Sequence, residues 1–316
     1  MITLFSLGAF LANSRAAAPE ASVLPGIHRI VFLGDSITYS GQYVEEFEAC
    51  LITRFPDRRF EIINLGLPSE TVSGLSEEGH AGGQFPRPDL HERLARVLEK
   101  TKPDLVVACY GMNDGIYLPL SEERFQKFRE GIQWLHAQVT KSGARILHVT
   151  SPTFDEVKGG HVGYGKTLDQ YSQWLLDRQA QGWDVVDVHG PMSRYLAKRR
   201  ASDPDFFLAG DGVHAGAIGH LIIAKQILTH LGLKEVKTAE NAGDLVAMHP
   251  KGNRILKLVE ERQRMMKDAW LTETRHLRPG MKTGLPLAEA RAKGEEFEKQ
   301  IHQLALAPVE SKPEAR

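Results

Sequence analysis

The sequence of 316 residues is long enough for one large domain or two ordinary ones. Its composition, 42% hydrophobic and 25% charged, is typical of a soluble globular protein. The formal net charge of -1 gives no reason to expect nucleic acid or an anionic membrane as a partner. Only two cysteines occur, Cys50 and Cys109, which excludes a disulfide scaffold, and no Cys/His spacing is typical of a zinc site.

The chain begins with a short apolar run, followed by small residues near Ala16 to Ala18. This pattern is typical of a secretory signal, so residues 1–27 are predicted to be a leader and the protein to be exported to the periplasm or the cell exterior. The usual positive start is missing, because the first basic residue is Arg15. A misassigned start or a disordered leader, with a cytoplasmic protein, is the alternative. No other run has the length of a membrane span, which argues against stable membrane insertion.

From His28 to about residue 232, apolar runs alternate with amphipathic helical patterns. This alternation predicts an α/β fold, with a parallel sheet of about five strands covered on both faces. Strands are expected at 29–33, 60–66, 104–110, 144–150 and 183–188. Helices are expected near 43–55, 90–99, 121–139, 168–179, 192–199 and 218–231.

Unusual residues follow three of these strands. The first strand ends at Gly34-Asp35-Ser36, which reads as a sharp turn that exposes a serine before a helix. The second ends at Gly66, and the third is followed by Asn113 and Asp114. The carboxyl ends of parallel strands form the ligand crevice of such a sheet, so these residues are expected to meet there.

Residues 233–316 are charged and carry no strand pattern. Apolar stripes predict two helices, near 254–270 and 287–306, followed by a frayed tail. We interpret this region as a helical C-terminal extension that packs on the main domain or on itself. A role in binding a partner or covering the site is the alternative.

Acyl transfer by serine needs a hydroxyl, a base, a group that orients the base, and donors for the oxyanion. Ser36 is the candidate nucleophile, His214 the base and Asp211 its orienting carboxylate. The backbone N–H groups of Ser36 and Gly66 and the side-chain amide of Asn113 are candidate oxyanion donors. Each residue alone has a structural interpretation, as a turn or a packing residue; the combination favours catalysis.

Four blocks in this order, Gly34-Asp35-Ser36, Gly66, Gly111-x-Asn113-Asp114 and Asp211-x-x-His214, resemble the SGNH (GDSL) hydrolase family over about residues 28–232. The resemblance implies a flavodoxin-like three-layer α/β/α sandwich and esterase or lipase-type hydrolysis without a cofactor. It assigns Ser36, Asp211 and His214 as the triad, and Ser36, Gly66 and Asn113 as the oxyanion hole. The chain departs from the family at residues 67–71, where further glycines are common, and at Ala215, where a proline is common.

The loops at 67–89 and 152–165 are polar and Gly-rich, and no exposed apolar lid is evident. They offer Gln84, Arg87, His161 and Tyr164 to hydroxyl-rich ligands. We therefore expect short-chain or acetyl esters, of small molecules or carbohydrates, as substrates. The sequence leaves the oligomeric state open.

Two other functions are alternatives to ester hydrolysis. A metal-dependent phosphoesterase would use Asp35, Asn113, Asp211 and His214 as ligands, but such sites generally need more carboxylates and histidines. A glycan-binding module without catalysis would keep the fold and lose the chemistry.

Overall fold

The computed structural model describes residues 24–307, so the predicted leader and tail lie almost wholly outside the described residues. Five parallel strands form one sheet in the order β2-β1-β3-β4-β5. Each strand lies within two residues of its predicted bounds. The strands are β1 (Arg29–Gly34), β2 (Glu61–Asn64), β3 (Leu105–Cys109), β4 (Arg145–Val149) and β5 (Asp184–Val186).

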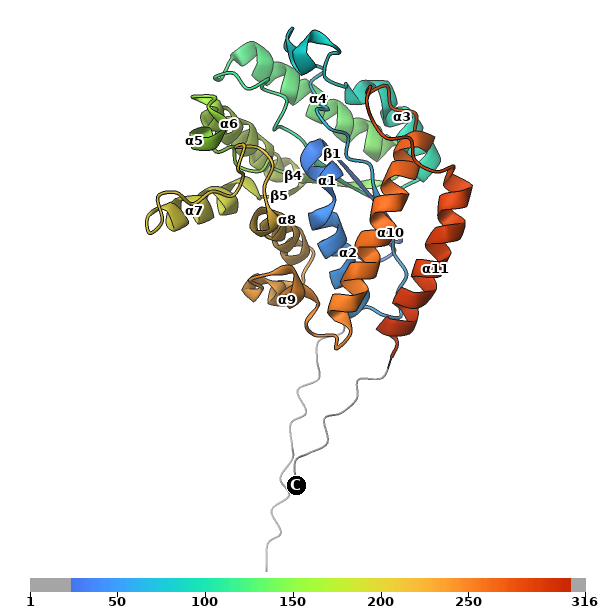
Figure 1. Cartoon of the computed structure of the whole chain (residues 1–316). Coiled ribbons are helices and arrows are strands. Elements are labelled where there is room, and N and C mark those ends of the chain that lie inside the picture. Colours follow the sequence, from blue (N-terminus) through green and yellow to red (C-terminus); the bar gives the residue numbers. More distant parts are fainter. Residues whose placement is uncertain (1–23, 308–316) are drawn as a thin grey trace, which may run out of the picture.

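Helices occupy most of the segments between the strands (Figure 1). The α-helices before β5 are α1 (Ser36–Ser40), α2 (Gln42–Arg54), α3 (Leu90–Thr101), α4 (Glu122–Lys141), α5 (Glu156–Gly159) and α6 (Tyr164–Asp177). Those after it are α7 (His189–Arg200), α8 (Ala217–His230), α9 (Ala242–Val246), α10 (Gly252–Glu273) and α11 (Leu287–Ala305). Short 3-10 helices lie at η2 (His80–Gly83), η3 (Arg178–Gln181) and η4 (Lys234–Thr238).

Successive side chains of β1 enter two separate hydrophobic cores. Ile30 and Phe32 pack with side chains of α2 and α8, whereas Val31 and Leu33 pack with those of α3 and α4. A strand points alternate side chains to opposite faces, so a strand that is apolar throughout needs helices on both. The prediction of a three-layer α/β/α sandwich with a five-stranded parallel sheet is confirmed.

The helix that carries the serine begins earlier than predicted. We expected a turn at Ser36 and a helix only from about residue 43, but α1 starts at Ser36 itself. The Asp35 side chain caps α1 by accepting a hydrogen bond from the Ile37 N–H at 2.9 Å. Gly41, in the left-handed conformation at φ 94°, ends α1 before α2. A helix of five residues is too short for a periodic pattern, which is why the sequence did not reveal it.

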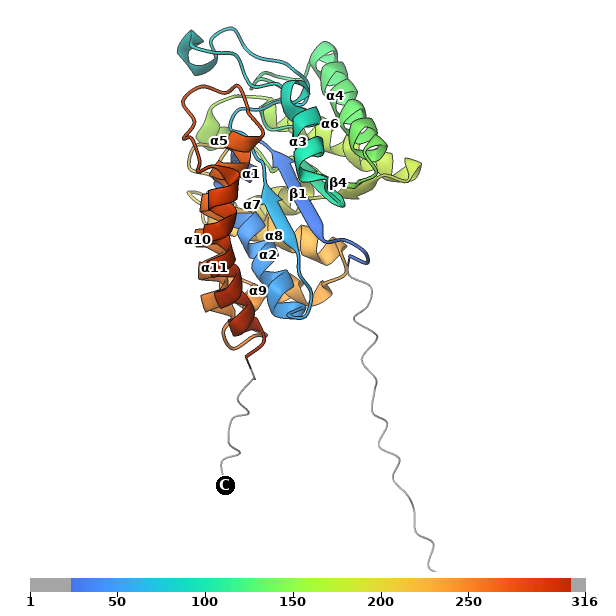
Figure 2. The ribbon, with the colours of Figure 1, turned by 90° about the vertical axis from the view of Figure 1, so that its right-hand side faces the viewer.

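The C-terminal helices close one edge of the sheet. Figure 2 shows α10 beside α11, with β2 between α10 and β1. The Gln263 amide of α10 donates to the Ile62 carbonyl of the edge strand at 2.9 Å and to Glu48 of α2 at 2.6 Å. An edge strand with free backbone groups invites pairing with other chains, and α10 prevents this here.

The extension therefore packs on the main domain, as interpreted from the sequence. Side chains of α10 and α11, among them Ile255, Val259 and Ile301, join the same core as α2 and α8. The division at residue 232 into two domains stays a prediction. Cys50 and Cys109 are free and buried. Among residues 24–307, no helix is both long and apolar enough to cross a bilayer.

One buried carboxyl on α2 makes stability depend on pH. Burial, together with the neighbouring Glu45 and Glu260 charges, raises the pKa of Glu46 to about 8. The folded protein therefore keeps this proton over a pH range in which the unfolded chain has lost it. The contribution of Glu46 to the free energy of unfolding therefore falls as pH rises from about 5 through 8.

We expect Glu46→Gln to remove part of this pH dependence, because the amide keeps the shape without the charge. The thermal midpoint should rise by about 2–4 °C over that of the wild type at pH 9, with no gain at pH 5. Thermal melts followed by circular dichroism at both pH values test this. Glu123→Gln on the exposed face of α4 serves as the control. An equal shift at both pH values would show that Glu46 does not titrate as described.

Candidate active site

The Ser36 hydroxyl lies at the end of a hydrogen-bond chain of three side chains. His214 Nε2 is 2.8 Å from Ser36 Oγ, and His214 Nδ1 is 2.6 Å from Asp211 Oδ2. Ser36 comes from the N-terminus of α1, whereas Asp211 and His214 come from the loop before α8, with His214 178 residues along the chain from Ser36. The candidate base is thus within hydrogen-bond reach of the candidate nucleophile, and a carboxylate contacts the far side of its ring.

Asp211 stays ionised although it belongs to a partly shielded site. Burial alone would raise its pKa, but hydrogen bonds from the His214 ring and from the backbone N–H groups of His214 and Val213 lower the pKa of Asp211 to about 2. The side chains of Asp211 and His214 are each 53% exposed. At neutral pH the Asp211 side chain is therefore an anion that faces the imidazole, in a site open to solvent.

The loop that carries Asp211 and His214 packs closely against α5 and the residue before it. Gly212 has φ 82°, and a Cβ there would lie 2.5 Å from the Gly159 nitrogen, so only glycine fits. The Asp155 N–H donates to the Gly212 carbonyl at 2.9 Å, and Asp155 is itself paired with Arg200 of α7 at 2.6 Å. These contacts fix the backbone of the Asp-x-x-His loop, from which His214 reaches Ser36 at the start of α1.

The three predicted oxyanion donors all lie at the carboxyl end of the sheet. Ser36 is the first residue of α1, so its N–H has no acceptor within the helix. Gly66 packs against α1, and its N–H donates to Asn64 Oδ1 at 2.9 Å. Asn113 is 4% exposed, and its Nδ2 donates to the Glu70 carbonyl at 3.2 Å. An oxyanion would therefore compete with Asn64 for the Gly66 N–H, whereas Asn113 keeps one amide hydrogen for it.

Two buried carboxylates, Asp114, which the sequence placed at this end of the sheet without a role, and Glu70, which it did not single out, join the loops of this site. Asp114 accepts the N–H groups of Val72 and Ser73, both at 2.8 Å, and that of Gly111 at 2.9 Å. Glu70 pairs with Arg93 at 2.5 Å and accepts the Tyr110 hydroxyl at 2.6 Å. The sequence signal for Asp114 was its place beside Asn113. Glu70 and Arg93 carry no motif that could have revealed them.

Residues 32–222 match the model of the GDSL-like Lipase/Acylhydrolase family. The chain belongs to this family. It is a carboxylic ester hydrolase, and the resemblance found in the sequence is confirmed.

The family assignment agrees with individual relatives. An acetylxylan esterase from Geobacillus stearothermophilus is 23% identical over 230 residues, which cover 66% of this chain and 96% of the relative. The crystal structure of an acetylxylan esterase from the same organism matches with a TM-score of 0.53 and 22% identity, over 69% of this chain and 100% of that one. The structure of a gut microbial diltiazem-metabolizing enzyme matches with the same TM-score and identity. The match covers 67% of this chain but only 48% of that one, so this chain spans about half of that protein. These likenesses support the fold.

Two of the four residues proposed to meet a hydroxyl-rich ligand are accessible to one. Gln84 at the end of η2 is exposed, and so is His161, whose ring lies 5.1 Å from that of Tyr117. Tyr164 is wrongly assigned, because it is fully buried and its hydroxyl donates to the Met112 carbonyl at 2.8 Å. Arg87 is also buried and is bound to Asn113.

Three apolar side chains are exposed on the segments that follow β3 and β4. Leu118, Val157 of α5 and Val162 are 44%, 75% and 81% exposed. The expectation that the site has no exposed apolar lid stays a prediction.

The four ligands of the rival metal site each have another role. Asp35 caps α1, Asn113 Oδ1 accepts two hydrogen bonds, and Asp211 holds His214. Within the described part of the chain, no group of three or more His, Cys, Asp or Glu side chains is arranged to hold a metal ion.

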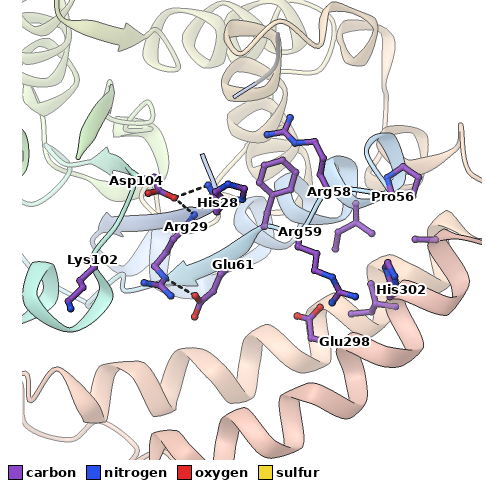
Figure 3. Close-up of a pocket in the computed structure, with 14 residues that line it drawn as sticks. His28, Arg29, Pro56, Arg58, Arg59, Glu61, Lys102, Asp104, Glu298 and His302 are labelled. Carbon is purple, nitrogen blue, oxygen red and sulfur yellow. Dashed lines mark hydrogen bonds and ion pairs between the residues drawn. The ribbon is translucent and has the colours of Figure 1, made fainter. Parts of the chain in front are cut away.

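A cavity of about 590 Å³ lies at the end of the sheet opposite the candidate triad, and Figure 3 shows the residues that line it. It is lined by residues at the amino ends of β1 and β2 and by α11, including Arg29, Glu61 and His302. None of its lining residues belongs to the triad, which lies at the carboxyl ends of the strands. Ser36 therefore does not lie in this cavity.

We expect Gly66→Ala to impair the site without changing any reacting group. A Cβ at Gly66 would lie 2.3 Å from the Tyr39 nitrogen and 2.6 Å from the Thr38 carbonyl carbon, so α1 must move. A displacement of Ser36 by about 1 Å should lower kcat roughly 100-fold. Steady-state hydrolysis of p-nitrophenyl acetate measures this. Gly79→Ala is the matched control, since nothing lies within 4 Å of that Cβ. Equal kcat values in the two variants would contradict the close packing.

Proposed function

We propose that this protein is a serine-dependent ester hydrolase that acts through an acyl-enzyme on short-chain or acetyl esters, in particular those of carbohydrates. The observation that carries the proposal is the continuous chain of hydrogen bonds from Asp211 through His214 to Ser36. The N-terminal pattern leads us to propose export as well.

The first half of the reaction transfers the acyl group to Ser36. His214 Nε2 takes the hydroxyl proton as Oγ attacks the ester carbonyl, and the Asp211 carboxylate stabilises the imidazolium that forms. The tetrahedral oxyanion accepts hydrogen bonds from Ser36, Gly66 and Asn113. On collapse the ester C–O bond breaks, and His214 returns the proton to the departing alcohol oxygen.

The second half releases the acid. Water gives a proton to His214 Nε2 and attacks the acyl carbon, and the proton passes to Ser36 Oγ as the acyl–enzyme bond breaks. The half-exposed triad leaves this water free access.

The acetyl and carbohydrate parts of the proposal rest on weaker support. A relative with 23% identity is an acetylxylan esterase, and Gln84 and His161 offer polar groups to a sugar. The exposed side chains of Leu118, Val157 and Val162 favour a second candidate, a lipase-type enzyme for longer acyl chains. A series of acyl chain lengths separates the two.

We expect Ser36→Ala to lower kcat by ~10³ or more, because the acyl-enzyme can no longer form. Rates for p-nitrophenyl acetate, butyrate and octanoate, and acetate release from acetylated xylo-oligosaccharides, are measured for both proteins. Fastest turnover of acetyl esters supports the proposal, and a preference for octanoate favours the second candidate. Equal rates in the wild type and Ser36→Ala would contradict a serine mechanism and favour the metal-dependent phosphoesterase hypothesis. Glycan binding without turnover in either would indicate a binding module.

We expect Asn113→Ala to lower kcat by ~10²–10³, the usual effect of removing one oxyanion donor. The Michaelis constant should change little, because the donor meets the developing charge rather than the substrate in its ground state. Steady-state kinetics with p-nitrophenyl acetate give both constants. A wild-type kcat would refute the role of Asn113.

A further inference from the structure

The Asn113 side-chain oxygen receives two hydrogen-bond donors. Arg87 Nη1 donates to Asn113 Oδ1 at 3.0 Å, and the Tyr117 hydroxyl donates to the same atom at 3.1 Å. A reversed amide would turn its NH₂ group toward two donors, so the network fixes the orientation. Nδ2 then gives one hydrogen to the Glu70 carbonyl, and the other has no acceptor among residues 24–307.

Arg87 is held in place for this contact. Its Nε and Nη2 atoms bind the two oxygens of Glu77, at 2.6 and 2.7 Å. Its backbone N–H donates to Ser76 Oγ at 2.9 Å, and its guanidinium lies 5.3 Å from the Tyr117 ring centroid. A planar guanidinium bound through two atoms to one carboxylate has little freedom to turn. The remaining guanidinium nitrogen, Nη1, is therefore held facing the Asn113 oxygen.

Tyr117 reaches Asn113 from a strained backbone. Ile116 has φ 49° and Tyr117 has φ 57°, although neither is glycine. The left-handed region is unfavourable for a β-branched residue such as Ile116. Strain of this kind persists where the surroundings impose it, and it often marks functional sites. Here the strained turn places the Tyr117 hydroxyl on the Asn113 oxygen.

We propose that Arg87 and Tyr117 are positioning residues that orient and polarise the Asn113 amide as an oxyanion donor, with Glu77 holding Arg87. A cation at the amide oxygen draws electron density from the nitrogen and strengthens the remaining N–H as a donor. Two fixed contacts also spare the amide any reorganisation when charge develops on the substrate. This inference rests on the proposed function.

A double-mutant cycle tests whether Arg87 acts through Asn113. Arg87→Met is made in the wild type and in Asn113→Ala, and kcat and KM are measured with p-nitrophenyl acetate. In the wild type we expect kcat to fall about 10- to 100-fold, as for loss of a charge-assisted hydrogen bond, with KM within about twofold. In Asn113→Ala we expect no further loss, because the amide that Arg87 orients is absent.

The cycle has clear opposing outcomes. Equal losses of kcat in both backgrounds, or a raised KM with unchanged kcat, would overturn the positioning role alone. A wild-type kcat in Asn113→Ala would instead refute the oxyanion assignment of the proposed function. Arg129→Met, which breaks an exposed ion pair with Glu122 on α4, is the matched control and should keep both constants.

Tyr117→Phe provides a second, milder cycle should Arg87→Met unfold. It removes one hydroxyl and leaves the partly buried ring in place. We expect a smaller fall in kcat, about 3- to 10-fold, that likewise disappears in Asn113→Ala. Arg87→Lys should recover part of the activity lost in Arg87→Met, because an ammonium can still donate to Oδ1. A Tyr117→Phe loss that persists in Asn113→Ala would overturn the proposal for Tyr117.

Discussion

The catalytic face of this protein depends on one buried carboxylate, Asp114. It accepts three backbone N–H groups, two from Val72 and Ser73 and one from Gly111, and so joins the loops after β2 and β3. Burial raises the pKa of Asp114, and the three N–H groups act against this by stabilising its charge. A buried charge without such partners would be strongly destabilising. Because Gly66 and Asn113 belong to these two loops, their relative placement follows from Asp114.

The carboxyl groups near Ser36 differ in pKa because their environments differ. Asp211, half-exposed and bonded to His214, has its pKa lowered to about 2, whereas burial raises the pKa of Asp35 to about 7. Burial also raises the pKa of Glu70, although Arg93 offsets part of this effect. The carboxylate beside the imidazole is thus the one that keeps its charge most firmly. The buried groups instead serve as acceptors that hold loops and helix ends.

Besides joining the core with α2 and α8, the C-terminal extension contacts the main domain at the edge and at the carboxyl end of the sheet. Along the sheet, α10 covers the edge of β2 through Gln263. At the carboxyl end of the strands, the loop between α10 and α11 reaches the loop after β2, where Arg278 Nε donates to the Pro68 carbonyl at 2.9 Å. The Arg278 guanidinium also lies 5.3 Å from the Phe85 ring centroid. The extension therefore supports the loop that carries Gly66, beyond the region that the family model covers.

The sequence by itself determined which segments form strands and helices and how these alternate along the chain, because apolar runs and helical stripes depend on local periodicity. It also singled out Ser36, Asp211 and His214 as the candidate triad, since they belong to short motifs in a fixed order, and the structure brings the three side chains together. The tertiary structure alone decided that Arg87 and Tyr117 meet Asn113, that Tyr164 is buried, and that α1 begins at Ser36. These features arise from contacts between loops far apart in the chain and from a single helix cap. Such contacts leave no periodic signal, so only the folded protein reveals them.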